Sequence, residues 1–137
     1  MKTIICDIDG TLTRYMDGGH ARVIHQDHEA LHGVVEHMRR WESQGARIIL
    51  ITGRRESVRQ RTEDELRRIG IPFDILLMGY ADSGRILIND ISPPVGDKAH
   101  AVKVTVPNKT LKMTTNNPGY IQVVAGTLKT KKHPKPA

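Results

Sequence analysis

The run DIDGTLT at residues 7–13, directly after the apolar run TIIC at residues 3–6, decides the fold predicted for this chain. β-Branched residues dominate the apolar run, so it is predicted to form a buried strand that leads into a loop. Gly10 permits a tight backbone conformation in that loop. The stretch therefore predicts two carboxylates, Asp7 and Asp9, held just beyond the carboxyl end of a first strand.

Helices and strands are predicted to alternate through the following residues. Apolar residues recur at helical spacing in two segments, which are predicted to be helices: residues 27–45, capped by Asp27, and residues 56–69. Short apolar runs predict the strands: residues 3–6, 47–51, 74–78, 86–89 and 101–106. This pattern predicts the α/β class, with a three-layer Rossmann-like fold and a central, mainly parallel sheet.

Composition divides the 137-residue chain into two segments. The net charge is +6, yet residues 98–137 contain eight lysines and none of the 15 acidic residues. We therefore expect one folded domain over residues 1–106 and a lysine-rich, partly disordered extension over residues 107–137. The single cysteine, Cys6, excludes an internal disulfide, and no apolar run reaches the roughly 18 residues that a membrane span needs. A cytoplasmic protein without a membrane partner is expected.

Polar residues follow three of the predicted strands. Asp7 and Asp9 follow the first strand, Thr52 follows residues 47–51, and Asp90 follows residues 86–89. Ligands of parallel α/β sheets bind beyond the carboxyl ends of the strands. The sequence therefore predicts one polar site at that edge of the sheet.

These motifs resemble those of the haloacid dehalogenase superfamily. The run DIDGTLT at residues 7–13 matches the DxDGTxT signature, ITGR at 51–54 resembles the second motif, and LIND at 87–90 resembles the acidic fourth motif. Family cap domains are inserted after the first motif or between the middle strands. Only residues 14–26 and 79–84 could serve here, and both are short. The chain thus resembles a small phosphatase-like member with a minimal cap or none.

The resemblance implies a defined chemistry. Asp7 is the expected nucleophile, which forms an aspartyl-phosphate, and Asp9 is the expected general acid/base. A Mg²⁺ ion is expected on the side chains of Asp7 and Asp90 and on the backbone carbonyl of Asp9. Thr52 and Gly53 are expected to hold phosphate oxygens. An ordinary turn at Thr52-Gly53 and a helix cap at Asp90 are the alternative interpretations.

The chain departs from the family pattern in one place. The superfamily expects a lysine or arginine that pairs with the nucleophile and phosphate, but no lysine lies between Thr52 and Asp90. Lys98, in the loop after Asp90, is the first candidate for this role, and Arg54 is the second. The histidines at residues 20–37, including His28 and His32, are interpreted as a solvated surface.

The predicted function is Mg²⁺-dependent hydrolysis of a small phosphorylated metabolite, such as a sugar phosphate. One alternative is a phosphatase that processes nucleic-acid ends through the basic tail. It is less favoured because Tyr120 is the only aromatic residue beyond residue 98, so base stacking has little support. The other alternative is a non-catalytic phosphate-binding relative. Because the predicted site is open, a second subunit is a further candidate partner.

Overall fold

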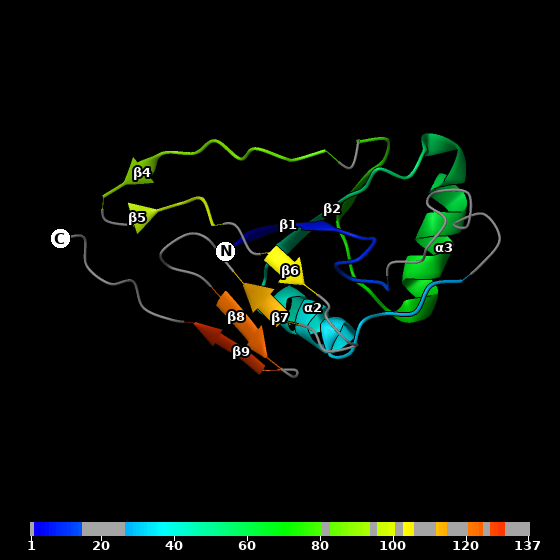
Figure 1. Ribbon diagram of the computed structural model, residues 1–137, viewed down its shortest axis with the longest axis horizontal. Helices are drawn as coiled ribbons and strands as arrows, with labels where there is room; N and C mark the ends of the chain where they lie inside the picture. Colours follow the sequence, from blue (N-terminus) through cyan, green and yellow to red (C-terminus); the bar gives the residue numbers. More distant parts are fainter. Residues whose placement is uncertain are drawn as a thin grey trace. The chain divides into compact units, whose positions relative to one another are not determined.

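The computed structural model describes residues 2–14, 27–80, 83–93, 96–100, 103–105, 112–114, 121–124 and 127–130. Contacts divide the chain into two compact units, Met1–Asp82 and Ser83–Ala137 (Figure 1). This division falls inside the segment 1–106, and the domain boundary expected after residue 106 stays a prediction.

A three-stranded parallel sheet forms the centre of the first unit. Its strands are β1 (Thr3–Asp7), β2 (Arg47–Ile51) and β3 (Ile75–Leu77), in the order β1-β2-β3. Asp7 pairs with Ile51, so the carboxyl ends of β1 and β2 are level. Residues that follow these two strands therefore begin at the same edge of the sheet.

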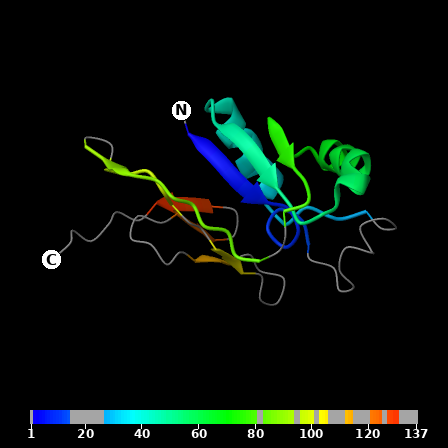
Figure 2. The same ribbon diagram turned by 90° about the horizontal axis from the view of Figure 1, so that it is seen from above.

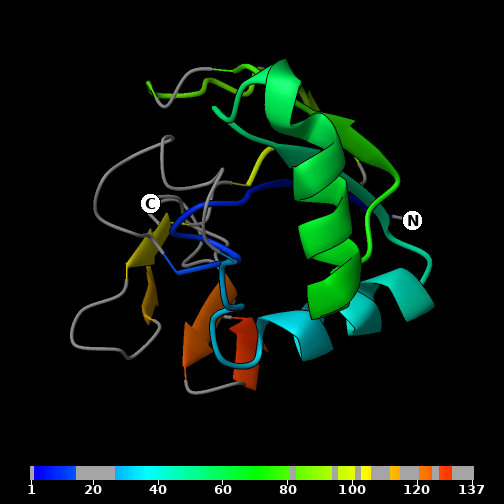
Figure 3. The same cartoon turned by 90° about the vertical axis from the view of Figure 1, so that its right-hand side faces the viewer.

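Helices connect the strands of the first unit. They are α2 (Val34–Ser43), the short 3₁₀ helix η1 (Glu56–Val58) and α3 (Arg59–Ile69). Figures 2 and 3 show α2 and α3 lying beside the three strands. Gly70 ends α3 with a φ of 86°, a left-handed conformation that glycine adopts without a steric penalty. The alternation of strands and helices confirms the predicted α/β, Rossmann-like class with a mainly parallel sheet.

The start of α2 corrects the prediction that Asp27 caps this helix. The N-cap is Gly33 instead. The preceding residues pair with the loop after β1, where Arg14 donates its N–H to the carbonyl of Glu29 at 3.0 Å and Leu31 donates to Leu12 at 2.9 Å. These backbone groups bond across to another segment, so they do not form a helical turn. We call residues 27–31 the strap.

Apolar side chains from the sheet and the helices form the core of the first unit. Sheet register places the buried Leu50 and Leu76 opposite each other. Met38 of α2 and Leu66 of α3 are also buried, at 1% and 0% exposure. This packing fixes the positions of the ends of β1 and β2 relative to each other. The backbone from which the following polar residues extend is therefore rigid.

The second unit contains only antiparallel strand pairs among its described residues. Its strands are β4 (Ile91–Ser92), β5 (Gly96–Asp97), β6 (Lys103–Thr105), β7 (Lys112–Thr114), β8 (Ile121–Val124) and β9 (Thr127–Thr130). The predicted strand at residues 86–89 is wrong. These residues have no strand partner in the structure, and an apolar run without a ladder is not a strand; Ile86 and Ile88 are 88% and 89% exposed.

Strands also occur within the segment 107–137. Lys129 and Thr130 belong to β9, where they pair with Gln122 and Ile121. The partial disorder expected of this segment stays a prediction. Residues 131–137 lie outside the described residues, as do residues 15–26, the first of the two segments considered for a cap. No helix within the described ranges combines the length and apolar character needed to cross a membrane.

Strand register gathers three lysine positions in the second unit. Thr105 pairs with Lys112, Lys103 pairs with Thr114, and Gln122 pairs with Lys129. Paired residues share one face of a sheet, and so do residues two apart along a strand. Lys112 also pairs with Val124, which connects the two halves. Lys103, Lys112 and Lys129 thus occupy positions on one face, which we call the lysine face.

Candidate active site

The loop after β1 presents the two aspartates of the first motif. Asp7 is the last residue of β1, and the carbonyl of Ile8 accepts the N–H groups of Leu12 and Thr13 at 2.8 and 3.1 Å. Gly10 adopts a φ of 81°, as the tight turn requires. The Thr11 hydroxyl donates to Oδ2 of Asp7 at 3.4 Å. Asp7 is half-buried at the end of β1.

The second motif lies at the same edge. Thr52 and Gly53 directly follow β2, whose last residue pairs with Asp7. Thr52 is buried, and its Oγ1 accepts the backbone N–H of Arg54 at 3.1 Å. A hydroxyl that accepts one hydrogen bond still has its own proton to donate. The structure therefore brings Asp7, Asp9, Thr52 and Gly53 together, as expected for residues that follow neighbouring parallel strands.

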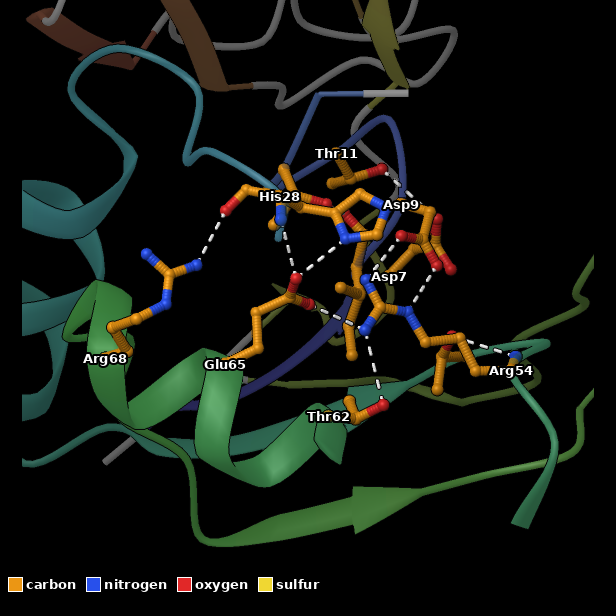
Figure 4. Close-up of polar contacts among 11 residues, drawn as sticks. Asp7, Asp9, Thr11, His28, Arg54, Thr62, Glu65 and Arg68 are labelled. Carbon is orange, nitrogen blue, oxygen red and sulfur yellow. Dashed lines mark hydrogen bonds and ion pairs between the residues drawn. The ribbon is translucent and has the colours of Figure 1, made fainter. Parts of the chain in front are cut away.

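Arg54 connects Asp9 to α3. Its side chain is 1% exposed, and its guanidinium forms a two-point contact with Asp9: Nε donates to Oδ2 at 2.9 Å and Nη2 to Oδ1 at 2.7 Å (Figure 4). Its Nη1 donates to Oε2 of Glu65 at 2.7 Å and to Oγ1 of Thr62 at 3.3 Å. Arg54, the second candidate for the family's cation, therefore contacts the expected acid/base and α3.

His28 contacts the carboxylate oxygen of Glu65 that does not bind Arg54. Oε1 of Glu65 accepts both the backbone N–H and Nδ1 of His28, each at 2.7 Å (Figure 4). The carbonyl of His28 accepts a hydrogen bond from Nη2 of Arg68 at 3.2 Å. His28 and Glu65 are 3% and 5% exposed, so the interpretation of His28 as part of a solvated surface is wrong. The strap carries His28 inward because it pairs with the loop after β1.

Each charged group of this network stabilises the charged form of its partner. Burial lowers the pKa of Arg54, but the carboxylates of Asp9 and Glu65 outweigh burial and raise that pKa above its ordinary value. Burial raises the pKa of Glu65, but hydrogen bonds from His28 and Arg54 outweigh burial and lower that pKa. Glu65 is therefore an ionised acceptor at neutral pH, and Nδ1 of His28 must carry the proton that it shares with Glu65.

Two predicted site residues lie in the second unit and pair with each other. Nζ of Lys98 lies 2.8 Å from Oδ1 and 3.0 Å from Oδ2 of Asp90. Lys98 is 36% exposed and Asp90 is 63% exposed, so this is a surface ion pair of modest energy. The roles predicted for both residues in metal and phosphate binding stay predictions.

The first unit offers few ligands for a metal ion among its described residues. No group of three or more His, Cys, Asp or Glu side chains lies close enough to hold one in the described part of the chain. The first unit nevertheless offers oxygen donors, the Asp7 carboxylate and the Asp9 carbonyl. Mg²⁺ binds through one or two carboxylates and keeps several waters, so this oxygen donor set fits its chemistry.

Sequence reasoning missed Thr62, Glu65 and His28. A signal existed for the first two, because Val58, Thr62, Leu66 and Ile69 repeat at helical spacing and Glu65 falls on the same face. A carboxylate on the buried face of a helix needs a buried partner. His28 lies 37 residues from Glu65, and no local pattern connects them.

Comparison with solved structures supports the fold. A chain of the Pnkp1/Rnl/Hen1 complex shares 30% identity at a TM-score of 0.51, over 62% of this chain and 30% of that chain. A chain of the Pnkp1/Rnl/Hen1 RNA repair complex gives the same identity and TM-score, over 61% of this chain and 27% of that chain. This protein thus spans less than a third of the length of either relative.

A third structure is less similar. It is the D,D-heptose 1,7-bisphosphate phosphatase from B. bronchiseptica complexed with magnesium and phosphate, with 21% identity and a TM-score of 0.44, over 61% of this chain and 52% of that chain. No curated protein matches the sequence.

The family comparison covers more of the sequence. The family model described as "PITM 1-3, LNS2 domain" matches residues 4–116. This range includes β1 from Ile4 onward, all of β2 and the whole network around Arg54. Because the match spans most of the chain, the protein belongs to the LNS2 domain family and has its haloacid dehalogenase-like phosphatase fold.

Proposed function

We propose that this protein is a Mg²⁺-dependent phosphomonoesterase in which Asp7 is the nucleophile and Asp9 the general acid/base. The observation that carries the proposal is the arrangement of the two aspartates at the end of β1. Asp7 is half-buried beside the second motif. Both carboxylate oxygens of Asp9 accept hydrogen bonds from Arg54. One carboxylate at the end of the strand beside a second one oriented by a guanidinium suits two different chemical roles.

The proposed reaction has two steps. A carboxylate oxygen of Asp7 attacks phosphorus, the bond from phosphorus to the ester oxygen breaks, and Asp9 gives its proton to the departing oxygen. Asp9 then takes a proton from a water molecule, which attacks the aspartyl-phosphate and releases inorganic phosphate. The Thr52 hydroxyl and the Gly53 N–H donate to the phosphate oxygens as charge develops on them.

The metal and the second cation complete the proposal. Mg²⁺ would be held by the Asp7 carboxylate and the Asp9 carbonyl, and would offset the charge of the phosphate. Asp90, the further ligand that the resemblance implies, belongs to the second unit, and its role stays a prediction. Lys98 is the candidate for the family's cation, because Arg54 is already engaged by Asp9, Thr62 and Glu65. A small phosphorylated metabolite such as a sugar phosphate is the proposed substrate class, and a second subunit is a proposed lid for the open site.

Metal removal tests this function directly. Hydrolysis of p-nitrophenyl phosphate by the full chain should require Mg²⁺, disappear in excess EDTA and return when Mg²⁺ is restored. The reason is that a dianionic phosphate and an attacking carboxylate repel each other without a cation. Release of p-nitrophenol, followed by absorbance, measures the rate. Turnover that persists in EDTA would refute the metal requirement, and folded protein without turnover of aryl or sugar phosphates would refute the phosphatase.

A second candidate function is a phosphatase that acts on RNA ends. Two observations favour it: the lysine face of the second unit, and the 30% identity to a chain of an RNA repair complex. Lysine positions on one face of a sheet suit the phosphates of a single strand, whose binding releases counterions and weakens with salt. The positions on the lysine face include no aromatic residue, so contacts to the backbone rather than to bases are expected.

Binding to a 3′-phosphorylated single-stranded RNA separates the two candidates. If Lys103, Lys112 and Lys129 each neutralise one phosphate, the logarithm of affinity should fall with the logarithm of salt concentration with a slope of about −2. Fluorescence anisotropy of a labelled oligonucleotide measures this slope. Replacing the three lysines by glutamine should remove most of the slope. A wild-type slope near zero would eliminate the RNA-end function.

A further inference from the structure

The orientation of the Asp9 carboxylate depends on a guanidinium. Both oxygens of Asp9 accept hydrogen bonds from Arg54, one from Nε and one from Nη2. Such a two-point contact fixes the plane of a carboxylate as well as its distance. A proton donor must aim at the leaving oxygen within a small angular range. Whatever orients Arg54 therefore orients Asp9.

Arg54 is in turn fixed from the opposite side. Its Nη1 contacts Glu65 at 2.7 Å and Thr62 at 3.3 Å, both on α3. The two carboxylate oxygens of Glu65 have different partners. Oε2 accepts a hydrogen bond from Arg54, and Oε1 accepts the backbone N–H and Nδ1 of His28. Neither oxygen of Glu65 can rotate away without breaking a buried contact to a charged or polar group.

The last residue of the network, His28, lies in a segment that hydrogen-bonds to the loop that carries Asp9. His28 belongs to the strap, which bonds through Glu29 and Leu31 to the end of the loop after β1. Asp9 is thus held from two directions, through the backbone of its own loop and through the side chains of Arg54, Glu65 and His28. A closed network of buried groups has one geometry, whereas a single ion pair permits several.

We propose that Glu65, with His28 behind it, is a positioning residue for proton transfer by Asp9 and acts through Arg54. This inference rests on the proposed phosphatase function. Within the network described above, Glu65 hydrogen-bonds to Arg54 and His28 hydrogen-bonds to Glu65, so both residues act on Asp9 through Arg54 and at a distance from the reacting atoms. A purely stabilising ion pair is the competing explanation, and the two differ in how catalysis depends on the leaving group.

Leaving-group dependence distinguishes positioning from stability. A poor leaving group such as an alkoxide needs a proton as it departs, whereas dinitrophenolate departs without one. A misplaced Asp9 therefore slows hydrolysis of an alkyl phosphate more than that of dinitrophenyl phosphate. A loss of folded protein lowers both rates by the same factor, so the ratio of the two kcat/KM values stays constant. The ratio is taken from kcat/KM because kcat also includes the later hydrolysis of the aspartyl-phosphate, which both substrates share.

The first variant is Glu65→Gln, which keeps the shape of the side chain but replaces one acceptor oxygen with an N–H₂ group. In the full chain with Mg²⁺, we expect kcat/KM for ethyl phosphate to fall at least about thirtyfold, a part of the 10²–10⁴-fold that general acids contribute. The kcat/KM for dinitrophenyl phosphate should fall less than about threefold, because this constant reports only the steps up to formation of the aspartyl-phosphate and the phosphate contacts remain. Glu63→Gln is the matched control on the same helix; Glu63 pairs with Arg67 at 3.2 Å, away from Arg54, and its variant should keep the wild-type ratio.

A pair of His28 variants repeats the test without altering a buried charge. Asparagine places an amide N–H near the position of Nδ1, so His28→Asn should retain the wild-type ratio, whereas His28→Leu should shift it in the direction of Glu65→Gln. Equal losses on the two substrates in both Glu65→Gln and His28→Leu would overturn the inference and leave the proposed function intact. If the wild type hydrolyses neither substrate, the proposed function is wrong and the inference falls with it.

Discussion

Replacing Asp7 with asparagine should abolish hydrolysis of aryl phosphates, with a fall in kcat of at least about a thousandfold. Asparagine has the shape of aspartate but lacks the anionic oxygen that attacks phosphorus in the proposed mechanism. The Thr11 hydroxyl can still donate to the amide oxygen, so the loop after β1 should keep its conformation. Single-turnover hydrolysis of p-nitrophenyl phosphate, with far-UV circular dichroism as the check on folding, measures the effect.

The control for this variant is Asp64→Asn. Asp64 is 61% exposed on α3, where it pairs with Arg67, and lies outside the network around Arg54. Its replacement should leave kcat within about twofold of the wild type, since an isolated exposed ion pair contributes little. Near-normal turnover by Asp7→Asn, beside an unaffected control, would rule out the aspartyl-phosphate mechanism while leaving the fold assignment as it stands.

Replacing Arg54 with methionine should have the largest effect on stability. Methionine fills much of the volume but leaves the carboxylates of Asp9 and Glu65 without their shared cation. Removing one partner of a buried ion pair costs roughly 3–5 kcal/mol, because the remaining charge stays buried and unpaired. The midpoint of urea unfolding, followed by circular dichroism, should therefore fall by about 1–3 M for a slope near 2 kcal/mol per M.

Arg67→Met is the matched control for this loss. Arg67 is 62% exposed and pairs with Glu63 and Asp64 on the surface of α3. Its replacement should lower the free energy of unfolding by less than about 1 kcal/mol. If Arg54→Met were as stable as this control, the network would contribute no net stability, and the buried charges would have to be relieved by water or by proton uptake.

Much of the fold could be predicted because its signals are local. β2 matches the predicted range, residues 47–51, since a run of four aliphatic residues after Arg47 leaves few alternatives. The convergence of Asp7, Asp9 and Thr52 followed from a geometric rule: neighbouring parallel strands end at the same edge. Gly70 ends α3 as predicted because the residue that closes a helix often needs a left-handed backbone.

The errors arise where distant segments decide the local structure. Asp27 is a good helix cap in isolation, but the strap forms backbone hydrogen bonds to the loop after β1, and α2 begins only after Gly33. The contacts of Arg54 were likewise out of reach of the sequence, because Asp9 and Glu65 lie 45 and 11 residues away from it. Its role in phosphate binding stays a prediction. Pairings of this kind depend on the assembled fold, and a linear pattern does not encode them.

The closed network around Asp9 also bears on how the protein loses activity. Asp9 is aligned only while α3, the strap and the end of β2 are all in place, and these segments are far apart in the chain. Proteins open locally before they unfold globally, and short segments at the surface open first. A brief detachment of the strap would release His28, then Glu65, and would disable the proposed proton transfer by Asp9 while the three-stranded sheet remained intact. The proposed activity should therefore be lost on warming at a lower temperature than the one at which the sheet unfolds.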